Sequence, residues 1–229
     1  MTNKRYKQIL IVLLVVFAVI IGCITVRNIA FPSSPISNTM TLEELQKMEI
    51  QVGYVETSET WTDEVYDAYY NNQIEGSKEA GCILIGVPTG NLYFNRGTIL
   101  QEVLVEQVIR GTCKYEKIWL QNGLRSTLVY EEEHVTLKGM DRSFMQEDCK
   151  YLLFCDPIAT NKYSDRKVYT EADAMWFGCY NLTRDCDVIM GENENAYNPD
   201  IEFYTSSEKT MQYYNEAKRA LVEMYCGEL

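Results

Sequence analysis

The longest apolar stretch of the chain lies at its N-terminus. From Ile9 to Val26 there is no charged residue over 18 positions. As a helix, this stretch would rise about 27 Å at ~1.5 Å per residue, which is close to the hydrocarbon thickness of a bilayer. The pattern predicts a transmembrane helix over residues 9–27, preceded by a charged segment at residues 1–8.

Charges on the two sides of this span set its expected orientation. Lys4, Arg5 and Lys7 precede it, and only Arg27 follows before the chain becomes acidic. Basic residues are enriched on the cytoplasmic side of membrane segments. We therefore expect a signal-anchored, single-pass protein of the cell membrane, with its N-terminus in the cytoplasm and its body on the extracytoplasmic side.

A lipoprotein signal is the alternative interpretation of the same stretch. The sequence IIGC at residues 20–23 resembles a bacterial lipobox, in which the chain is cut before the cysteine and Cys23 carries the lipid. Residues 24–26 argue against a lipobox, because they prolong the apolar run past the cysteine. An ordinary secretory signal is not indicated, since no A-x-A type of cleavage site follows. Both interpretations keep the protein on the membrane.

The next residues read as a linker and a lead-in to the main body. Residues 28–40 contain the Pro and Ser of a spacer. The lead-in covers residues 41–79, where a T-x-x-E pattern from Thr41 predicts a capping box and a short helix. Apolar alternation predicts a short strand at 50–54, and near-helical spacing predicts a second helix over 60–73.

Residues 80–182 have the alternation and the β-branched and aromatic content of strands. Gly111 ends the longest of these runs, and the residues PTGN at 88–91 predict a turn after the first strand. The expected strands are 82–87, 99–110, 117–121, 126–130, 134–137, 150–155 and 175–180.

The period of the pattern changes toward the C-terminus. Residues 183–205 are interpreted as an acidic loop region, and residues 206–229 as an amphipathic helix that packs on the β region. Gly227 is expected to end this helix. The apolar positions that recur every three or four residues are Met211, Tyr214, Ala217, Leu221 and Met224.

Charge and cysteine content narrow the classes of partner. The formal net charge is −12, whereas nucleic-acid binding takes its affinity from Lys and Arg on phosphates, so no nucleic-acid partner is expected. Eight cysteines include no C-x-x-C pair and His134 is the sole histidine, which argues against zinc. Cys179 and Cys186 are close enough in sequence to close a short disulfide loop, and most other cysteines are expected to be small buried apolar residues.

Two chemical alternatives stay open. His134 lies beside a run of three glutamates, and a hydrolase would depend on it, with Ser126 or Cys149 nearby, or on a pair of carboxylates. No spacing brings these groups together, so no catalytic or cofactor-binding residues are assigned and no cofactor is predicted. A calcium-stabilised surface protein is the other alternative, although the spacing is not that of an EF-hand. Its oxygen ligands would come from Asp185, Asp187, Glu192, Glu194 and Asp200.

Four segments of the β region occur in the order of the strands in a module of bacterial surface proteins: CILIGVPTG, LQEVLVEQVIRG, EKIWLQNG and DCKYLLFCDP. This order resembles the OB-type barrel of the tissue-inhibitor-of-metalloproteinase and netrin family over about a third of the chain. The resemblance implies a small closed barrel of about five strands. The C-x-C start that those inhibitors insert into a protease is absent, so inhibition is not carried over.

The expected fold class is mainly β with flanking helices. It comprises an N-terminal transmembrane helix, an OB-like closed β-barrel of about five strands over residues 80–182, and the C-terminal helix. The expected function is that of a non-catalytic binding module for an extracytoplasmic protein or envelope ligand. An extracytoplasmic hydrolase and a calcium-stabilised surface protein are the alternatives.

Intact mass spectrometry of the membrane-extracted protein distinguishes the two interpretations of the N-terminus. An uncleaved anchor is expected to give a mass that begins at Met1. A mass that begins at Cys23 with added acyl chains would contradict the uncleaved anchor and would identify a lipoprotein.

Overall fold

The structure is a computed structural model, and the chain divides into two compact units, Met1–Ile36 and Ser37–Leu229. In the first unit the described residues are helical and exposed. Every strand and helix named below belongs to the second unit. The described residues are Leu13, Val16, Phe17, 38–52, 61–95, 98–121, 127–131, 134–138, 142–158, 165–185, 188–190 and 196–227.

In the described part of the chain, no helix combines the length and the apolar character required to cross a bilayer. This finding contradicts the transmembrane helix predicted over residues 9–27, and with it the single-pass, signal-anchor topology. The two long helices that are described, α3 (Asp63–Glu79) and α4 (Glu208–Cys226), carry charged residues along their length. A membrane interior disfavours such residues strongly. Of residues 9–27 themselves, three are described.

Strand β3 (Cys82–Asn95) is the centre of the larger sheet. It pairs antiparallel with β4 (Thr98–Arg110) and β8 (Tyr151–Pro157), and its second half also pairs with β1 (Thr39–Thr41). The turn predicted at 88–91 was wrong, because the strand continues through it with a shift in register. Gly90, with φ +77°, accommodates this irregularity, since a positive φ has little steric cost for glycine.

Three short strands complete this sheet: β5 (Lys117–Gln121), β9 (Val168–Glu171) and β10 (Cys179–Asn181). The order is β1-β3-β4-β5-β9-β8-β10, with β5 and β9 parallel and the other neighbours antiparallel. An additional pairing joins β3 to β8. Strands β3, β4, β5, β9 and β8 are therefore hydrogen-bonded in succession and back to β3.

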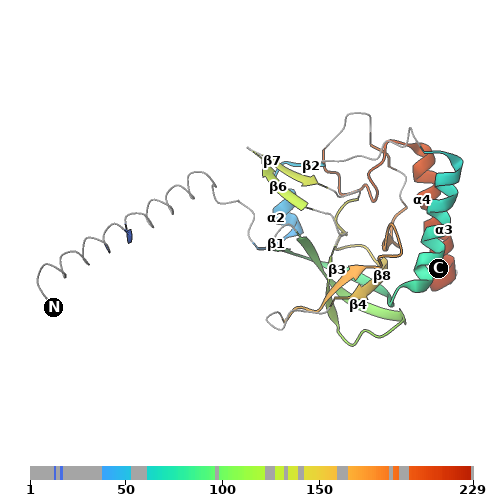
Figure 1. Cartoon of the computed structure of the whole chain (residues 1–229), viewed down its shortest axis with the longest axis horizontal. Coiled ribbons are helices and arrows are strands. Elements are labelled where there is room, and N and C mark those ends of the chain that lie inside the picture. The colour runs from blue at the N-terminus through green and yellow to red at the C-terminus, as the bar shows by residue number, and fades with distance from the viewer. Residues whose placement is uncertain are drawn as a thin grey trace, which may run out of the picture. The chain divides into compact units, whose positions relative to one another are not determined.

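A separate three-stranded sheet lies beside α2 (Figure 1). In it, β2 (Ile50–Val52) runs parallel to β7 (His134–Lys138), which pairs antiparallel with β6 (Thr127–Glu131). The predicted capping box of α2 (Leu42–Gln46) is confirmed. The Glu44 N–H donates to Thr41 Oγ1 at 3.1 Å, and the Thr41 N–H donates to Glu44 Oε2 at 2.8 Å.

Helices α3 and α4 lie side by side against one side of the strands (Figure 1). They run parallel, because an ion pair joins Lys209 to Asp63 at their starts and the Ser77 and Tyr225 hydroxyls lie 3.0 Å apart near their ends. The predicted start of α4 is confirmed: the Ser207 hydroxyl accepts from the Thr210 N–H, and Gly227 is the C-cap.

Two apolar cores lie on opposite faces of β8. Leu152 and Phe154 point into the core under α3 and α4, which we call the helix-side core and which also holds Tyr214 and Leu221. Tyr151, Leu153 and Cys155 point into a second core with Cys82 and Ile118, which we call the strand-side core. Alternate residues of a strand face opposite sides, so β8 separates the two cores.

The predicted fold class was therefore wrong in two respects. It included a membrane-spanning helix, which the described residues do not contain. It also placed the strands in a single barrel of about five, whereas the five strands that close on β3 belong to a seven-stranded sheet, and a separate three-stranded sheet is present among the described residues. Strands β1 and β9 were missed because, at three and four residues, they carry too little alternation to stand out. The strand expected at 175–180 is confined to β10, since residues 175–178 lie outside a strand.

Substitution of Gly111 tests how closely the backbone after β4 approaches Gly81. Its φ is +85°, and a Cβ there would lie 2.1 Å from the Gly81 carbonyl oxygen. We expect Gly111→Ala to lower the free energy of unfolding by about 3 kcal/mol, from backbone strain and steric overlap together. Gly227→Ala is the matched control, because its φ is +74° but nothing lies within 4 Å, and its loss should be about 1 kcal/mol. Equal losses in urea titrations would contradict this account.

Candidate functional site

A hollow lies between α4 and the turn that follows β10. Its volume is 660 Å³, and we call it the α4 hollow. One wall comes from the turn and the other from α4 and its cap. The lining residues are Asn181, Leu182, Thr183, Arg184, Asp185, Asn215, Lys218, Arg219, Val222, Glu223 and Gly227.

The Asn181 side chain shapes the turn wall. Its Oδ1 accepts from the Thr183 N–H at 2.8 Å and from the Arg184 N–H at 3.0 Å, which is an Asx turn. The turn is tied to the start of β8, because the Lys150 N–H donates to Thr183 Oγ1 at 2.8 Å and the Lys150 carbonyl accepts from the Leu182 N–H at 2.7 Å. Three hydrogen bonds from backbone N–H groups to side chains and one between backbone groups therefore preform this wall.

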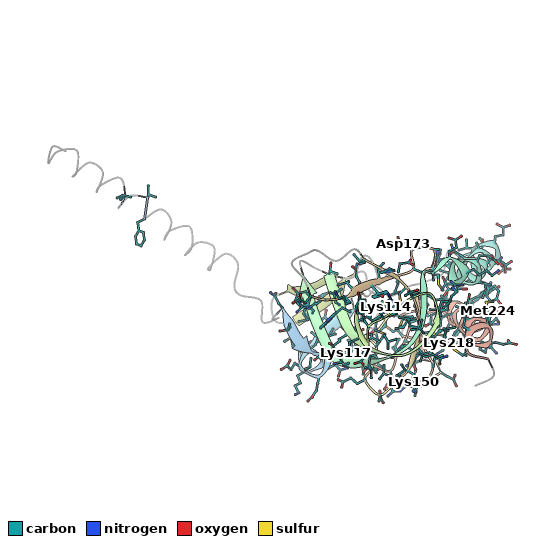
Figure 2. All side chains as sticks on the ribbon, turned by 90° about the horizontal axis from the view of Figure 1, so that it is seen from below. Lys114, Lys117, Lys150, Asp173, Lys218 and Met224 are labelled. Carbon is teal, nitrogen blue, oxygen red and sulfur yellow. The ribbon has the colours of Figure 1, made fainter. Side chains whose placement is uncertain are left out.

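A buried ion pair beneath the hollow connects its two walls. Lys218 of α4 is 7% exposed and donates to Glu202 Oε2 at 2.8 Å and to the Arg184 carbonyl at 2.9 Å. Glu202 Oε1 accepts from the Asn181 N–H at 2.5 Å. One lysine therefore holds the helix wall, the turn wall and the segment around Glu202 together. Lys218 is labelled in Figure 2.

Arg184 forms the outer edge of the turn wall. Its guanidinium donates to Asp148 at 2.6 Å and to Asp200 at 3.0 Å. The hydrogen bond from Arg184 lowers the pKa of Asp148 below its usual value. Because these carboxylates are exposed, we regard them as positioning Arg184 and not as a major source of stability.

A smaller cavity of 30 Å³ lies next to the α4 hollow and shares Asn181, Arg184 and Asp185 with it. Arg142 lines this cavity and forms a buried ion pair with Glu171. Its Nη1 has no hydrogen-bond partner among the described residues. The cavity has room for one water molecule, which needs about 10–15 Å³.

The carboxylates expected to bind calcium are only partly described. Asp185 lines the α4 hollow, Asp200 pairs with Arg184, and the other three lie outside the described residues. In the part of the chain that the structure describes, no group of three or more His, Cys, Asp or Glu residues could hold a metal ion. The calcium hypothesis therefore gains no support from Asp185 and Asp200.

Of the three residues named for catalysis, Cys149 is the one whose side chain belongs to the described part of the structure. The backbone of His134 begins β7, but its side chain and Ser126 lie outside the described residues. Cys149 is buried in the strand-side core, where burial raises the pKa of its thiol. The hydrolase hypothesis stays untested.

The cysteines of the body are mostly buried, as the sequence predicted. Six are free thiols in the described residues, of which four are buried. One of these is Cys179, and burial raises its pKa to about 12. Cys186, its proposed disulfide partner, and Cys23, the alternative lipid site, lie outside the described residues.

Lys218 and Glu202 are the residues of the candidate site that sequence reasoning missed. A signal for Lys218 was present: it follows Tyr214 by four residues and precedes Leu221 by three, so helical spacing places it on the apolar face of α4. A charge on such a face needs a buried partner. Glu202 carries no comparable signal, because its role depends on the path of the chain between β10 and α4.

No family model matches the chain, and neither the curated proteins nor the solved structures contain a match. The resemblance to the tissue-inhibitor-of-metalloproteinase and netrin family therefore stays a prediction. Functional inference has to come from the α4 hollow and from the chemistry of the described residues.

Lys218→Met tests the link between the two walls. Removal of the cation leaves the Glu202 carboxylate buried without its partner, which should lower the free energy of unfolding by about 3–5 kcal/mol. Lys78→Met is the control. It removes an exposed partner of Glu75 and should change the free energy of unfolding by less than about 1 kcal/mol. The free energy of unfolding of both variants is measured by urea denaturation. A similar loss of stability in the two variants would show that Lys218 does not hold the walls together.

Proposed function

We propose that the Ser37–Leu229 unit is a non-catalytic binding module, and that the α4 hollow holds a peptide segment of an extracytoplasmic protein partner. The observation that carries the proposal is the hollow itself, with its preformed turn wall and buried ion pair. Its volume of 660 Å³ lies within the range of about 300–1,000 Å³ that is usual for ligand sites.

The composition of the lining favours binding over catalysis. Its eleven residues include no Ser, Cys or His, which are the usual nucleophiles and general bases. Its carboxylates, Asp185 and Glu223, come from opposite walls. Neither shows the burial or the charged partner that would adapt a carboxyl group to acid or base chemistry.

The same lining favours a peptide over other ligands. Of the three cations in the lining, Lys218 and Arg184 are paired with carboxylates. Arg219 shares the lining with the carboxylates of Asp185 and Glu223, so the hollow offers little excess charge to a phosphate. No aromatic residue is present on which a base could stack. The apolar side chains of Leu182 and Val222 alternate with amide, hydroxyl and guanidinium groups, and a peptide presents the matching mixture of side chains and backbone amides.

The extracytoplasmic location is part of the proposal. It is supported by the basic residues before the apolar N-terminal stretch, because a charged segment followed by an apolar one is also the composition of a secretory signal. Lipid attachment at Cys23 would provide an anchor that does not require a membrane-spanning helix. The intact mass measurement described above tests this attachment.

A blocked hollow tests the proposal. Glu223 lies on the exposed surface of α4 and lines the hollow, so Glu223→Trp should fill part of it without disturbing a buried contact. Gln212→Trp is the matched control, since Gln212 is exposed on the same helix but does not line the hollow. Short random peptides displayed on phage are selected on the full-length chain, and their affinities for both variants are measured by titration.

We expect the selected peptides to bind the wild type and Gln212→Trp equally and to bind Glu223→Trp at least about tenfold more weakly, or about 1.4 kcal/mol. Peptides that bind all three proteins equally would show that the α4 hollow is not the site. Turnover of a selected peptide would show that the unit is an enzyme and would contradict the proposal of a non-catalytic binding module.

A further inference from the structure

Two cysteines lie directly opposite each other in the pairing of β3 with β8. Cys82 is the first residue of β3, and its partner in the antiparallel register is Cys155. The next pair along the ladder is Ile83 with Phe154. The thiols of Cys82 and Cys155 are free in the structure, and their residues are 2% and 0% exposed. The α4 hollow uses neither of them.

The backbone hydrogen bonds define the geometry of this pair. The Phe154 N–H donates to the Gly178 carbonyl at 2.7 Å, and the Phe154 carbonyl accepts from the Ala172 N–H at 3.0 Å. Both partners lie on the side of β8 away from β3. Because these groups alternate along a strand, those of Cys155 point toward β3, and Cys82 with Cys155 is a hydrogen-bonded pair with its Cα atoms about 5.5 Å apart.

That separation suits a disulfide bond. Disulfides join Cα atoms that are about 4.4–6.8 Å apart, and their commonest separation is about 5.5–6 Å. Opposed residues extend their side chains from the same face of a sheet, and both cysteines belong to the strand-side core. Because the Cβ atoms of a hydrogen-bonded pair lie at the wide end of the range of about 4.5–5.5 Å, those of Cys82 and Cys155 need to approach by about 1 Å to reach the disulfide range.

A third thiol lies at the edge of this core. Cys113 is partly exposed and packs against the strand-side core from the loop that follows β4. The same loop contacts Cys82, because the Thr112 carbonyl accepts from the Cys82 thiol at 3.5 Å. A Cβ on Gly111 would lie 3.1 Å from Cys82 Sγ. Residues 111–113 therefore cover the buried pair and supply the thiol that a reagent in solvent can reach.

We propose that Cys82 and Cys155 are a site of oxidation to a cross-strand disulfide, and that Cys113 is the thiol through which oxidation enters. The oxidant is a small-molecule disulfide, as found in oxidising compartments. Direct attack by the buried thiols is slow, since burial raises the pKa of both Cys82 and Cys155.

The exchange has three steps. The Cys113 thiolate attacks the small disulfide, forms a mixed disulfide and releases one small thiolate. Cys82, on losing its proton, attacks the Cys113 sulfur and releases the second small thiolate. Cys155, on losing its proton, attacks the Cys82 sulfur, which forms the Cys82–Cys155 bond and returns Cys113 to the thiolate. In total, two protein thiols lose two electrons and two protons, and the small disulfide is reduced to two thiols.

The sequence suits a direct test by peptide mapping. Trypsin cleavage after Lys and Arg places the three thiols in separate fragments, 79–96, 111–114 and 151–162. The native full-length chain is incubated with oxidised glutathione, quenched in acid, alkylated and digested. We expect fragment 79–96 to be joined to 151–162, and the pair to separate on reduction. A final product that joins 79–96 to 111–114, or full alkylation of all three fragments, would overturn the proposal.

Variants test the roles separately. Cys155→Ala should abolish the cross-link, whereas Cys149→Ala should leave it, and the latter is a matched control because Cys149 is also buried in the strand-side core. Oxidation should raise the urea midpoint of the wild type and of Cys149→Ala but not that of Cys155→Ala, since a disulfide restricts the unfolded chain.

Cys113→Ser should slow formation of the cross-link in the native protein by at least about tenfold. Refolding the denatured Cys113→Ser variant in oxidised glutathione should restore the cross-link, because Cys82 and Cys155 are accessible to the reagent in the unfolded chain. An unchanged rate in the native variant would exclude Cys113 as the point of entry. If Cys155→Ala fails to fold, the cross-linked fragments of the wild type still decide the outcome.

Discussion

The pairing of β3 with β8 is the constraint on which the rest of the structure depends. It joins two strands that β4, β5 and β9 separate in the order of the sheet. Strand β8 thereby has neighbours on both edges, and its residues from Tyr151 to Cys155 are all buried. A strand that is covered on both faces needs apolar side chains at successive positions, which explains the unbroken run YLLFC.

The helices are attached to this framework by polar groups as well as by apolar packing. Gln73 of α3 is fully buried, donates to the Phe177 carbonyl at 3.0 Å and accepts from the Trp176 N–H at 2.6 Å. These backbone groups precede β10 and have no strand partner there, so a side chain has to satisfy them. The position of β10, and of the turn that forms one wall of the α4 hollow, follows from this contact.

The two proposals concern opposite faces of the same strand. Leu182 and Val222 of the α4 hollow pack against the helix-side core, whereas Cys82 and Cys155 belong to the strand-side core. Formation of the disulfide would restrain β3 and β8 without altering a residue that lines the hollow. Peptide binding and oxidation are therefore separable, although an oxidising compartment outside the cytoplasm would suit both.

Local patterns in the sequence determined the elements whose signals are contained within a few residues. The capping box at Thr41, the strand of β4 up to Gly111 and the amphipathic stripe of α4 depend on local backbone geometry and periodicity, so they could be predicted without a fold. Tertiary structure decided the rest. Strand partners, the pairing of Cys82 with Cys155 and the contact of Lys218 with Glu202 depend on which distant segments meet. Whether a charge or a thiol is buried depends on the distant segments that pack around it, and the neighbouring residues along the chain do not determine this.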